Sequence, residues 1–431
     1  MPTDRLTDQQ RDRLREVLAP VRGVSLDLDA LARYDLHPRR LDDVVTSHGL
    51  DEGRLDFRRP VWPVPYHLDV ARFTQGLHDA LKDRVVGYSM ELRRHGMSIA
   101  AQNYGWAKTP PDGGQPWTTG VRMHVASVSK LITAIAMTKV LAAHGISPDA
   151  KMTGYLPGYW NKGPHVGEIT FRQLMTHRSG FDVPGSASDF GTMKSQVASG
   201  VAATGGYHYE NMNFGLCRLL IATITGAVPV DARFVIPFLP EDLIWDYVAT
   251  TAYAQFVGWH VWEAACVTGP TLTHPSEDAL AYDFPVGSGW NSGDLTSMAG
   301  GAGWHASVRD LLAVLNDFRR VGTILTAAQA QQMLDDGFGI DLTLSTAAGT
   351  LYNKNGLWRD GSGRSEQSLA YVLPEDMELV VLTNSTVGVA DEFFRDVVTD
   401  VYLANLHPAL DLPFPVEQAH DVHHPLPVGA R

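Results

Sequence analysis

The most informative pair of residues is Ser127 and Lys130, in the run HVASVSKLITAIAMTKVLAAHG. Residues three apart lie on one face of a helix, so this spacing could bring a hydroxyl beside an amine. Apolar residues continue at helical spacing up to Gly145, which predicts a buried helix. Burial favours the neutral form of lysine, and a neutral amine can accept the proton of a serine hydroxyl. The pair therefore predicts a serine nucleophile that forms an acyl-enzyme.

Taken alone, the Ser-x-x-Lys tetrapeptide permits a second interpretation. Ser127 would then be only the N-cap of the helix, and Lys130 a solvated surface residue. A motif this short also arises by chance in a chain of 431 residues. The choice therefore depends on residues elsewhere in the chain.

Two further polar motifs follow in order. Tyr209-Glu210-Asn211 begins 82 residues after Ser127, and Lys354-Asn355-Gly356 begins a further 145 residues on. Together with Ser127 and Lys130, they resemble the serine β-lactamase and penicillin-binding-protein superfamily. The resemblance is to its class C branch, which includes the family VIII carboxylesterases. It extends over about residues 71 to 405, including ITFRQLMTHRSGF before the tyrosine and GGAGWHASVRDLLAVLN at 300 to 316.

The resemblance implies a catalytic role for three side chains. Ser127 would attack a carbonyl carbon, and neutral Lys130 would act as the base. The hydroxyl of Tyr209 would share that proton and deliver it to the leaving group. The alternative for Tyr209 is an ordinary core tyrosine.

The resemblance also implies a binding role for five further residues. Asn211 would orient Lys130, although it could instead be a simple turn residue. Two backbone N–H groups, those of Ser127 and Leu357, would form an oxyanion hole worth about 3 kcal/mol per donor. Gly356 would let the substrate approach its strand, and Lys354 and Asn355 complete the third motif.

Several roles are possible for Lys354. Asn-Lys-Asn-Gly is also a good type I′ hairpin turn, which would place the lysine outside any site. Within a site, its cation could attract a substrate carboxylate or only lower the pKa of Tyr209. Asn355 stands where Thr, Ser or Gly is commoner in the family, and the following stretch GLWRDGSGRSEQS is longer than usual. We therefore expect a remodelled substrate rim.

Patterns along the chain predict an α/β (α+β) fold of the β-lactamase type. Residues 85 to 92 with 97 to 104, and 367 to 373 with 378 to 384, read as two strand pairs of one antiparallel sheet. Helical patterns lie at 127 to 144, 307 to 319, 326 to 334 and 390 to 404. Helices would flank the sheet, a mainly helical subdomain at about 127 to 300 would be inserted, and the active site would lie between them.

The ends of the chain resemble nothing in the family. Residues 1 to 70 read as an extension, helical at 4 to 22 and irregular at 26 to 66, and residues 406 to 431 as a Pro/His-rich tail. The N-terminus lacks the apolar core of a signal peptide, and no apolar run approaches the roughly 20 residues that span a bilayer. We expect a cytoplasmic protein without a membrane partner.

Composition narrows the function classes. The net charge of −13, without a Lys/Arg-rich run, argues against nucleic acid as a partner. Two distant cysteines suggest neither a disulfide framework nor a zinc site, and we expect no metal or cofactor. Six tryptophans lie between Trp245 and Trp358; most should be packing residues, but one or two could line an apolar pocket.

These observations favour a carboxylesterase that acts on small-molecule esters with a hydrophobic part. The same acyl-enzyme could serve an acyltransferase or an amide hydrolase such as a D-aminopeptidase or β-lactamase, and sequence alone does not separate them. A silent scaffold is a third possibility, although all three motifs keep their polar residues. The sequence predicts no oligomeric state.

Overall fold

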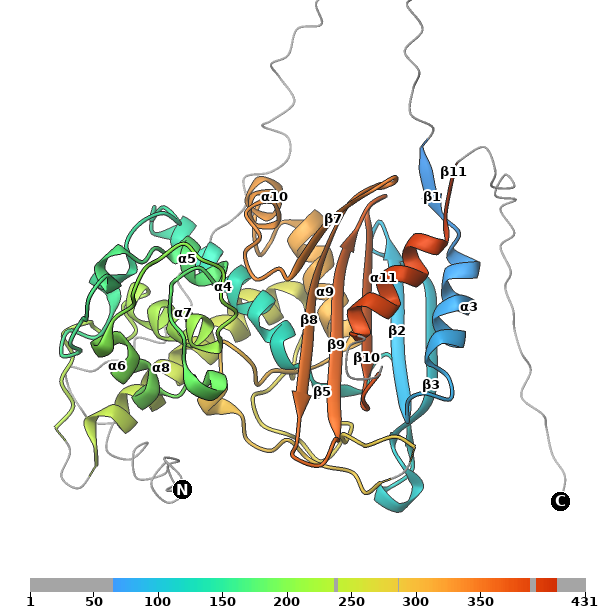
Figure 1. Cartoon of the computed structure of the whole chain (residues 1–431), viewed down its shortest axis with the longest axis horizontal. Helices are drawn as coiled ribbons and strands as arrows, with labels where there is room; N and C mark the ends of the chain where they lie inside the picture. The colour runs from blue at the N-terminus through green and yellow to red at the C-terminus, as the bar shows by residue number, and fades with distance from the viewer. Residues whose placement is uncertain (1–64, 236–238, 286, 388–392, 409–431) are drawn as a thin grey trace, which may run out of the picture.

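The computed structural model describes residues 65–235, 239–285, 287–387 and 393–408 (Figure 1). The helix predicted at 4 to 22 and nearly all of the irregular stretch after it lie outside these residues. Most of the expected Pro/His-rich tail also lies outside them.

The centre of the fold is a seven-stranded sheet in which all neighbours are antiparallel. The order of its strands across the sheet is β4 (Gln115–Pro116), β3 (Met97–Lys108), β2 (Gly87–Arg94), β10 (Met377–Thr383), β9 (Ser365–Leu373), β8 (Gly349–Arg359) and β7 (Leu342–Thr346). The two predicted strand pairs are present, and they meet where β10 pairs with β2. The prediction of one antiparallel sheet is confirmed.

Strands β9 and β10 are buried along their whole length, because both faces of the sheet are covered. Side chains alternate between the faces of a strand. Leu369 and Tyr371 accordingly pack in one hydrophobic cluster, and Ala370 and Val372 in the other. Burial here is not limited to apolar residues, because β9 begins with four buried polar residues, Ser365 to Ser368.

Each face of the sheet has its own helices. Helices α3 (Val70–Leu81) and α11 (Phe394–Ala404) supply the apolar residues of the cluster on one face. Helix α9 (Val308–Asn316) contributes to the cluster on the other face, and α10 (Ala327–Asp335) follows it. Figure 1 shows the helices numbered α5 to α8 gathered on one side of the sheet, with α4 between them and the strands.

The helical segment is inserted between two short paired strands, β5 (Arg122–His124) and β6 (His305–Ser307). Its α-helices are α4 (Ser129–Ala143), α5 (Phe171–Met175), α6 (Phe190–Ser199), α7 (Asn211–Ile224) and α8 (Glu241–Val257). Because β5 and β6 pair with each other in a small sheet of their own, the helical segment begins and ends at one place. The three motif regions must meet near this junction.

Helix α4 is the buried helix that the sequence predicts. With the turn before it, Ala126–Ala143 forms an 18-residue stretch of mean hydropathy 1.4, long and apolar enough to cross a bilayer by length and composition. This run is closer to spanning length than we expected from the sequence. However, 78% of it is buried inside the fold, where it packs in the main hydrophobic cluster.

Two short strands join the end of the expected extension to the start of the expected tail. Tyr66–Leu68 forms strand β1, which pairs antiparallel with β11, Leu406–Pro408. A three-residue strand has too little periodicity to be recognised, and its partner lies more than three hundred residues away.

Candidate active site

Ser127 lies in a short 3₁₀ turn, Ala126–Val128, between β5 and α4. Ala126 has a φ of 44°, in the left-handed region that side chains other than glycine rarely adopt. The residue at the N-cap position of α4 is Val128, and no side chain caps the helix. The interpretation of Ser127 as a mere N-cap is therefore wrong, and its half-buried side chain stays accessible.

Lys130 is fully buried, so the interpretation as a solvated residue is also wrong. Its Nζ lies 2.9 Å from Ser127 Oγ, 2.6 Å from Asn211 Oδ1 and 2.8 Å from the carbonyl oxygen of Gly301. Burial lowers the pKa of Lys130 below its ordinary 10.5, and the cation of Lys354 lowers it further. The first two motifs thus meet at one amine.

Tyr209 is 36% exposed, which rules out an ordinary core tyrosine. Two amines approach its ring: Lys130 Nζ lies 4.9 Å from the ring centroid, and Lys354 Nζ 5.1 Å from it. Burial of the hydroxyl tends to raise the pKa of Tyr209, but Lys130 and Lys354 outweigh burial and hold it below 10.0. The phenol can therefore exchange a proton with a neighbouring amine.

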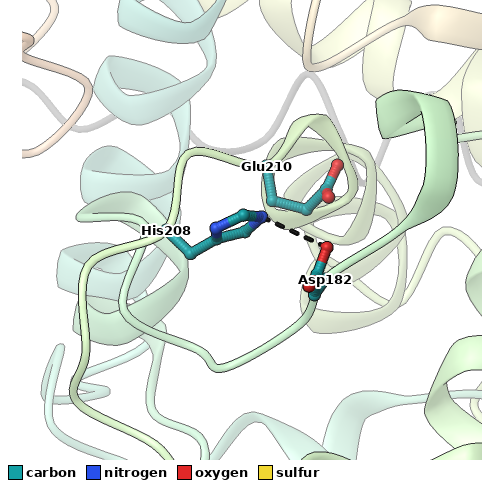
Figure 2. Close-up of side chains that lie close together, drawn as sticks. All are labelled: Asp182, His208 and Glu210. Carbon is teal, nitrogen blue, oxygen red and sulfur yellow. Dashed lines mark ion pairs between the residues drawn. The ribbon is translucent and has the colours of Figure 1, made fainter.

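Glu210 holds the loop that carries Tyr209. Its carboxylate accepts from the backbone N–H groups of Val183, at 2.9 Å, and Met212, at 3.4 Å. Figure 2 shows it beside His208 and Asp182, which form an ion pair at 3.4 Å. Each of these three residues offers one atom that could bind a metal ion, and these three atoms lie within 4.8 Å of one another. Since Glu210 already serves two backbone donors, we assign it a structural role.

Lys354 lies within strand β8, paired with Ala370 of β9, so the hairpin-turn interpretation of Asn-Lys-Asn-Gly is wrong. Its side chain is fully buried, and Nζ donates to Asp341 Oδ1 at 2.6 Å. Burial lowers the pKa of Lys354, but Asp341 and Tyr209 together outweigh burial and raise the pKa above 10.5. Lys354 is therefore a cation.

Gly356 is the point at which β8 approaches the turn Ala126–Val128, which carries Ser127. A Cβ on Gly356 would lie 2.5 Å from Val125 O and 2.9 Å from Ser127 N, so only glycine allows this approach. Strand side chains alternate, which puts Lys354 on the same face as Gly356. Asn355 and the exposed Leu357 project from the opposite face and add only their backbone to this group.

A buried polar pair lies behind the turn that carries Ser127. His124, the last residue of β5, contacts Glu366 Oε2 through Nδ1 at 3.0 Å and accepts from Gly303 N–H through Nε2 at 3.1 Å. Burial raises the pKa of Glu366 to about 8 and lowers that of His124 to about 3. Both groups are therefore neutral near pH 7. Together they connect β5 and β9 to the backbone of Gly303.

The sequence did not predict two residues that contact the motif side chains, Asp341 and His177. The ring of His177 packs on Tyr209, and Asp341 neutralises Lys354. His177 did lie in a stretch that resembles the family, but a histidine beside a tyrosine motif in space leaves no mark in the sequence. Trp245, Trp262 and Trp304 are buried packing residues, as expected for most of the tryptophans.

Comparisons with known proteins show the family and the fold. Residues 70–403 match the family described as Beta-lactamase. The esterase EstB of Burkholderia gladioli is 30% identical over 126 residues, a match that covers 27% of this chain and only 31% of that esterase.

Two solved structures illustrate the likeness of fold. A class C β-lactamase from Rhodobacter sphaeroides has a TM-score of 0.56 and 18% identity, covering 77% of this chain and 98% of its own. A D-amino acid amidase from Ochrobactrum anthropi SV3 has a TM-score of 0.57 and 19% identity, covering 77% and 95%. Because the family match extends over most of the chain, from α3 to α11, and the fold is the same, this chain belongs to the Beta-lactamase family and has its serine-hydrolase-type fold.

Proposed function

We propose that the protein is a serine hydrolase that cleaves carboxylic esters through an acyl-enzyme on Ser127. The observation that carries this proposal is the set of three contacts around Lys130 Nζ. The proposal adds a substrate class to the family assignment, because the family alone gives no specific substrate.

The three contacts of Lys130 suit a neutral amine. Asn211 Oδ1 and the carbonyl oxygen of Gly301 can only accept hydrogen bonds, so they take its two N–H groups. The lone pair of the amine is then directed at Ser127 Oγ, 2.9 Å away. An amine held in this way is ready to receive the hydroxyl proton, which is the task of a general base.

Acylation begins when Ser127 Oγ attacks the ester carbonyl and its proton passes to Lys130. The resulting oxyanion would accept from the backbone N–H groups of Ser127 and Leu357, beside the close approach at Gly356. Collapse of this intermediate breaks the ester C–O bond. Tyr209 delivers a proton to the departing alkoxide and regains one from Lys130, so an alcohol leaves and the acyl group stays on Ser127.

Deacylation uses the same groups in reverse. A water molecule attacks the acyl carbonyl and gives its proton to the Lys130–Tyr209 pair, and that proton returns to Ser127 Oγ as the acid departs. An alcohol in place of water would give acyl transfer by the same steps.

Two observations support an ester with a hydrophobic part. A segment of this chain is similar to EstB, and that relative is an esterase. The exposed aromatic ring of Tyr207 also lies beside the site. The ring of Tyr207 lies 6.2 Å from that of His177, which packs on Tyr209.

The proposal is tested by intact-mass spectrometry with turnover measured in parallel. Wild type and Ser127→Ala are exposed to p-nitrophenyl hexanoate, a chromogenic cephalosporin and a D-amino acid amide. We expect a Ser127-dependent acyl adduct and fast turnover with the ester alone. The control is Ser195→Ala, an exposed serine of α6, which should behave as wild type. Faster turnover of the amide or the cephalosporin would replace the esterase assignment.

A further inference from the structure

We infer that Asp341 makes this site selective for acyl groups that carry no carboxylate. The inference rests on the proposed ester hydrolysis and adds the substrate class to it. It starts from the ion pair between Asp341 and Lys354, which neither the family match nor the sequence motifs assign.

Asp341 is bound to β8 on both sides of Lys354. Its Oδ1 accepts from Lys354 Nζ at 2.6 Å, and its Oδ2 accepts from the backbone N–H of Asn355 at 3.2 Å. Its own N–H donates to the carbonyl oxygen of Asn353 at 2.9 Å. The exposed fractions of the two charged side chains are 0% for Lys354 and 9% for Asp341. The pair is therefore a fixed part of the strand.

Lys354 would otherwise be the cation that faces the substrate. It shares a face of β8 with Gly356, whose position touches Ser127 N, and its Nζ lies 5.1 Å from the Tyr209 ring centroid. A substrate carboxylate near the acyl carbonyl would need this charge. However, the cation of Lys354 is already paired with the carboxylate of Asp341.

The charges around the nucleophile consequently cancel. With Lys130 as an amine and Tyr209 as a phenol, Lys354 and Asp341 give a net charge of zero. The sum is unchanged when a proton moves from Tyr209 to Lys130. An anionic acyl group would leave water without gaining a counter-charge, which is costly in a buried environment. An uncharged acyl group does not meet this cost.

The experiment compares two p-nitrophenyl esters of equal chain length, the hexanoate and the adipate monoester, at pH 7. For wild type, we expect kcat/KM to favour the hexanoate by at least about tenfold, which corresponds to about 1.4 kcal/mol. Asp341→Asn keeps an acceptor for Asn355 N–H but removes the charge. It should raise kcat/KM for the adipate by about tenfold, mainly through KM, with a smaller change for the hexanoate.

Two further variants identify the cause. In the double variant Asp341→Asn with Lys354→Met, the gain for the adipate should disappear, because no cation remains. Asp231→Asn removes one negative charge from an exposed turn and should leave the ratio of the two esters as in wild type. If Asp341→Asn does not fold, the wild-type ratio still tests the inference.

Acyl adducts on Ser127 are followed by mass in the same mixtures. Equal hexanoyl and adipoyl formation in wild type would overturn the selectivity while leaving ester hydrolysis standing. The absence of any hexanoyl adduct would overturn both the inference and the proposed function.

Discussion

The imidazole of His177 stacks on the phenol of Tyr209, with 4.3 Å between ring centroids and 27° between ring planes. Its Nδ1 accepts from the backbone N–H of Glu210 at 3.1 Å. Burial, together with the neighbouring Lys354 and Lys130, lowers the pKa of His177 to about 2. The ring is therefore neutral and supports the tyrosine loop as a stacking surface and as a hydrogen-bond acceptor.

We predict that His177→Ala lowers kcat by about tenfold and leaves KM nearly unchanged. The expected loss corresponds to about one net hydrogen bond of 0.5 to 1.5 kcal/mol. His177→Phe keeps the stacked ring without the acceptor and should retain more activity than the alanine variant. Steady-state kinetics on one ester decide the matter, and equal kcat values in all three proteins would show that the stack does not position Tyr209.

The value of kcat/KM should rise with pH along an acidic limb, and the midpoint of this limb should lie below 10.5. Below that midpoint Lys130 is an ammonium and cannot accept a proton, and burial places the midpoint low. Lys354→Met removes a cation that lowers the pKa of Lys130, so its limb should move to higher pH. A pH–rate profile measures both midpoints, and a shift to lower pH would contradict the electrostatic assignment.

Gly356→Ala should damage both stability and turnover. The added Cβ would lie 2.4 Å from Ser368 Oγ and within 3.0 Å of the backbone at Val125 and Ser127. Overpacking of this kind costs about 1 to 3 kcal/mol. Thermal melting and kcat should both fall. The matched control is Gly361→Ala, where a Cβ meets nothing within 4 Å, and an equal effect there would refute the argument from close approach.

Glu366→Gln should remove part of the loss of stability that occurs as pH rises from about 4.5 to about 8. Folded Glu366 keeps its proton up to about pH 8, whereas the unfolded chain releases it near 4.5. The folded state thus binds more protons in this window, so its free energy of unfolding falls as pH rises, by up to about 1.4 kcal/mol per pH unit.

The glutamine variant lacks this loss, so its stability relative to wild type should increase from pH 5 to pH 8 in urea unfolding. Glu277→Gln, which replaces an exposed carboxylate, should show a flat difference over the same range. A flat difference for Glu366→Gln as well would mean that Glu366 is ionised in the folded protein.

Local patterns were enough to predict the sheet pairs and helix α4, which its long apolar run made recognisable. The places of Tyr209 and Asn211 beside Lys130 were predicted from the resemblance to the family. The spacing did not reveal Asp341, because its contact with Lys354 depends on the register in which β7 meets β8. Register is set by pairing across the sheet rather than by residues next to each other in the chain.

The turn interpretation of Lys354 failed for a related reason. Asn-Lys-Asn-Gly has the composition of a hairpin turn, but β9 pairs with all four residues and keeps them extended. Tertiary pairing overrides a local preference of this size.

The order of strands also has a consequence for how the protein is made. Strand β2 is synthesised near the beginning of the described chain, yet its permanent neighbour β10 begins only at Met377. Pairings across such a distance in sequence form late and slowly. Ser127 and Lys130 therefore leave the ribosome long before the strand that carries Gly356 can close over them. The reactive serine gains its full surroundings only after strand β8 has been translated.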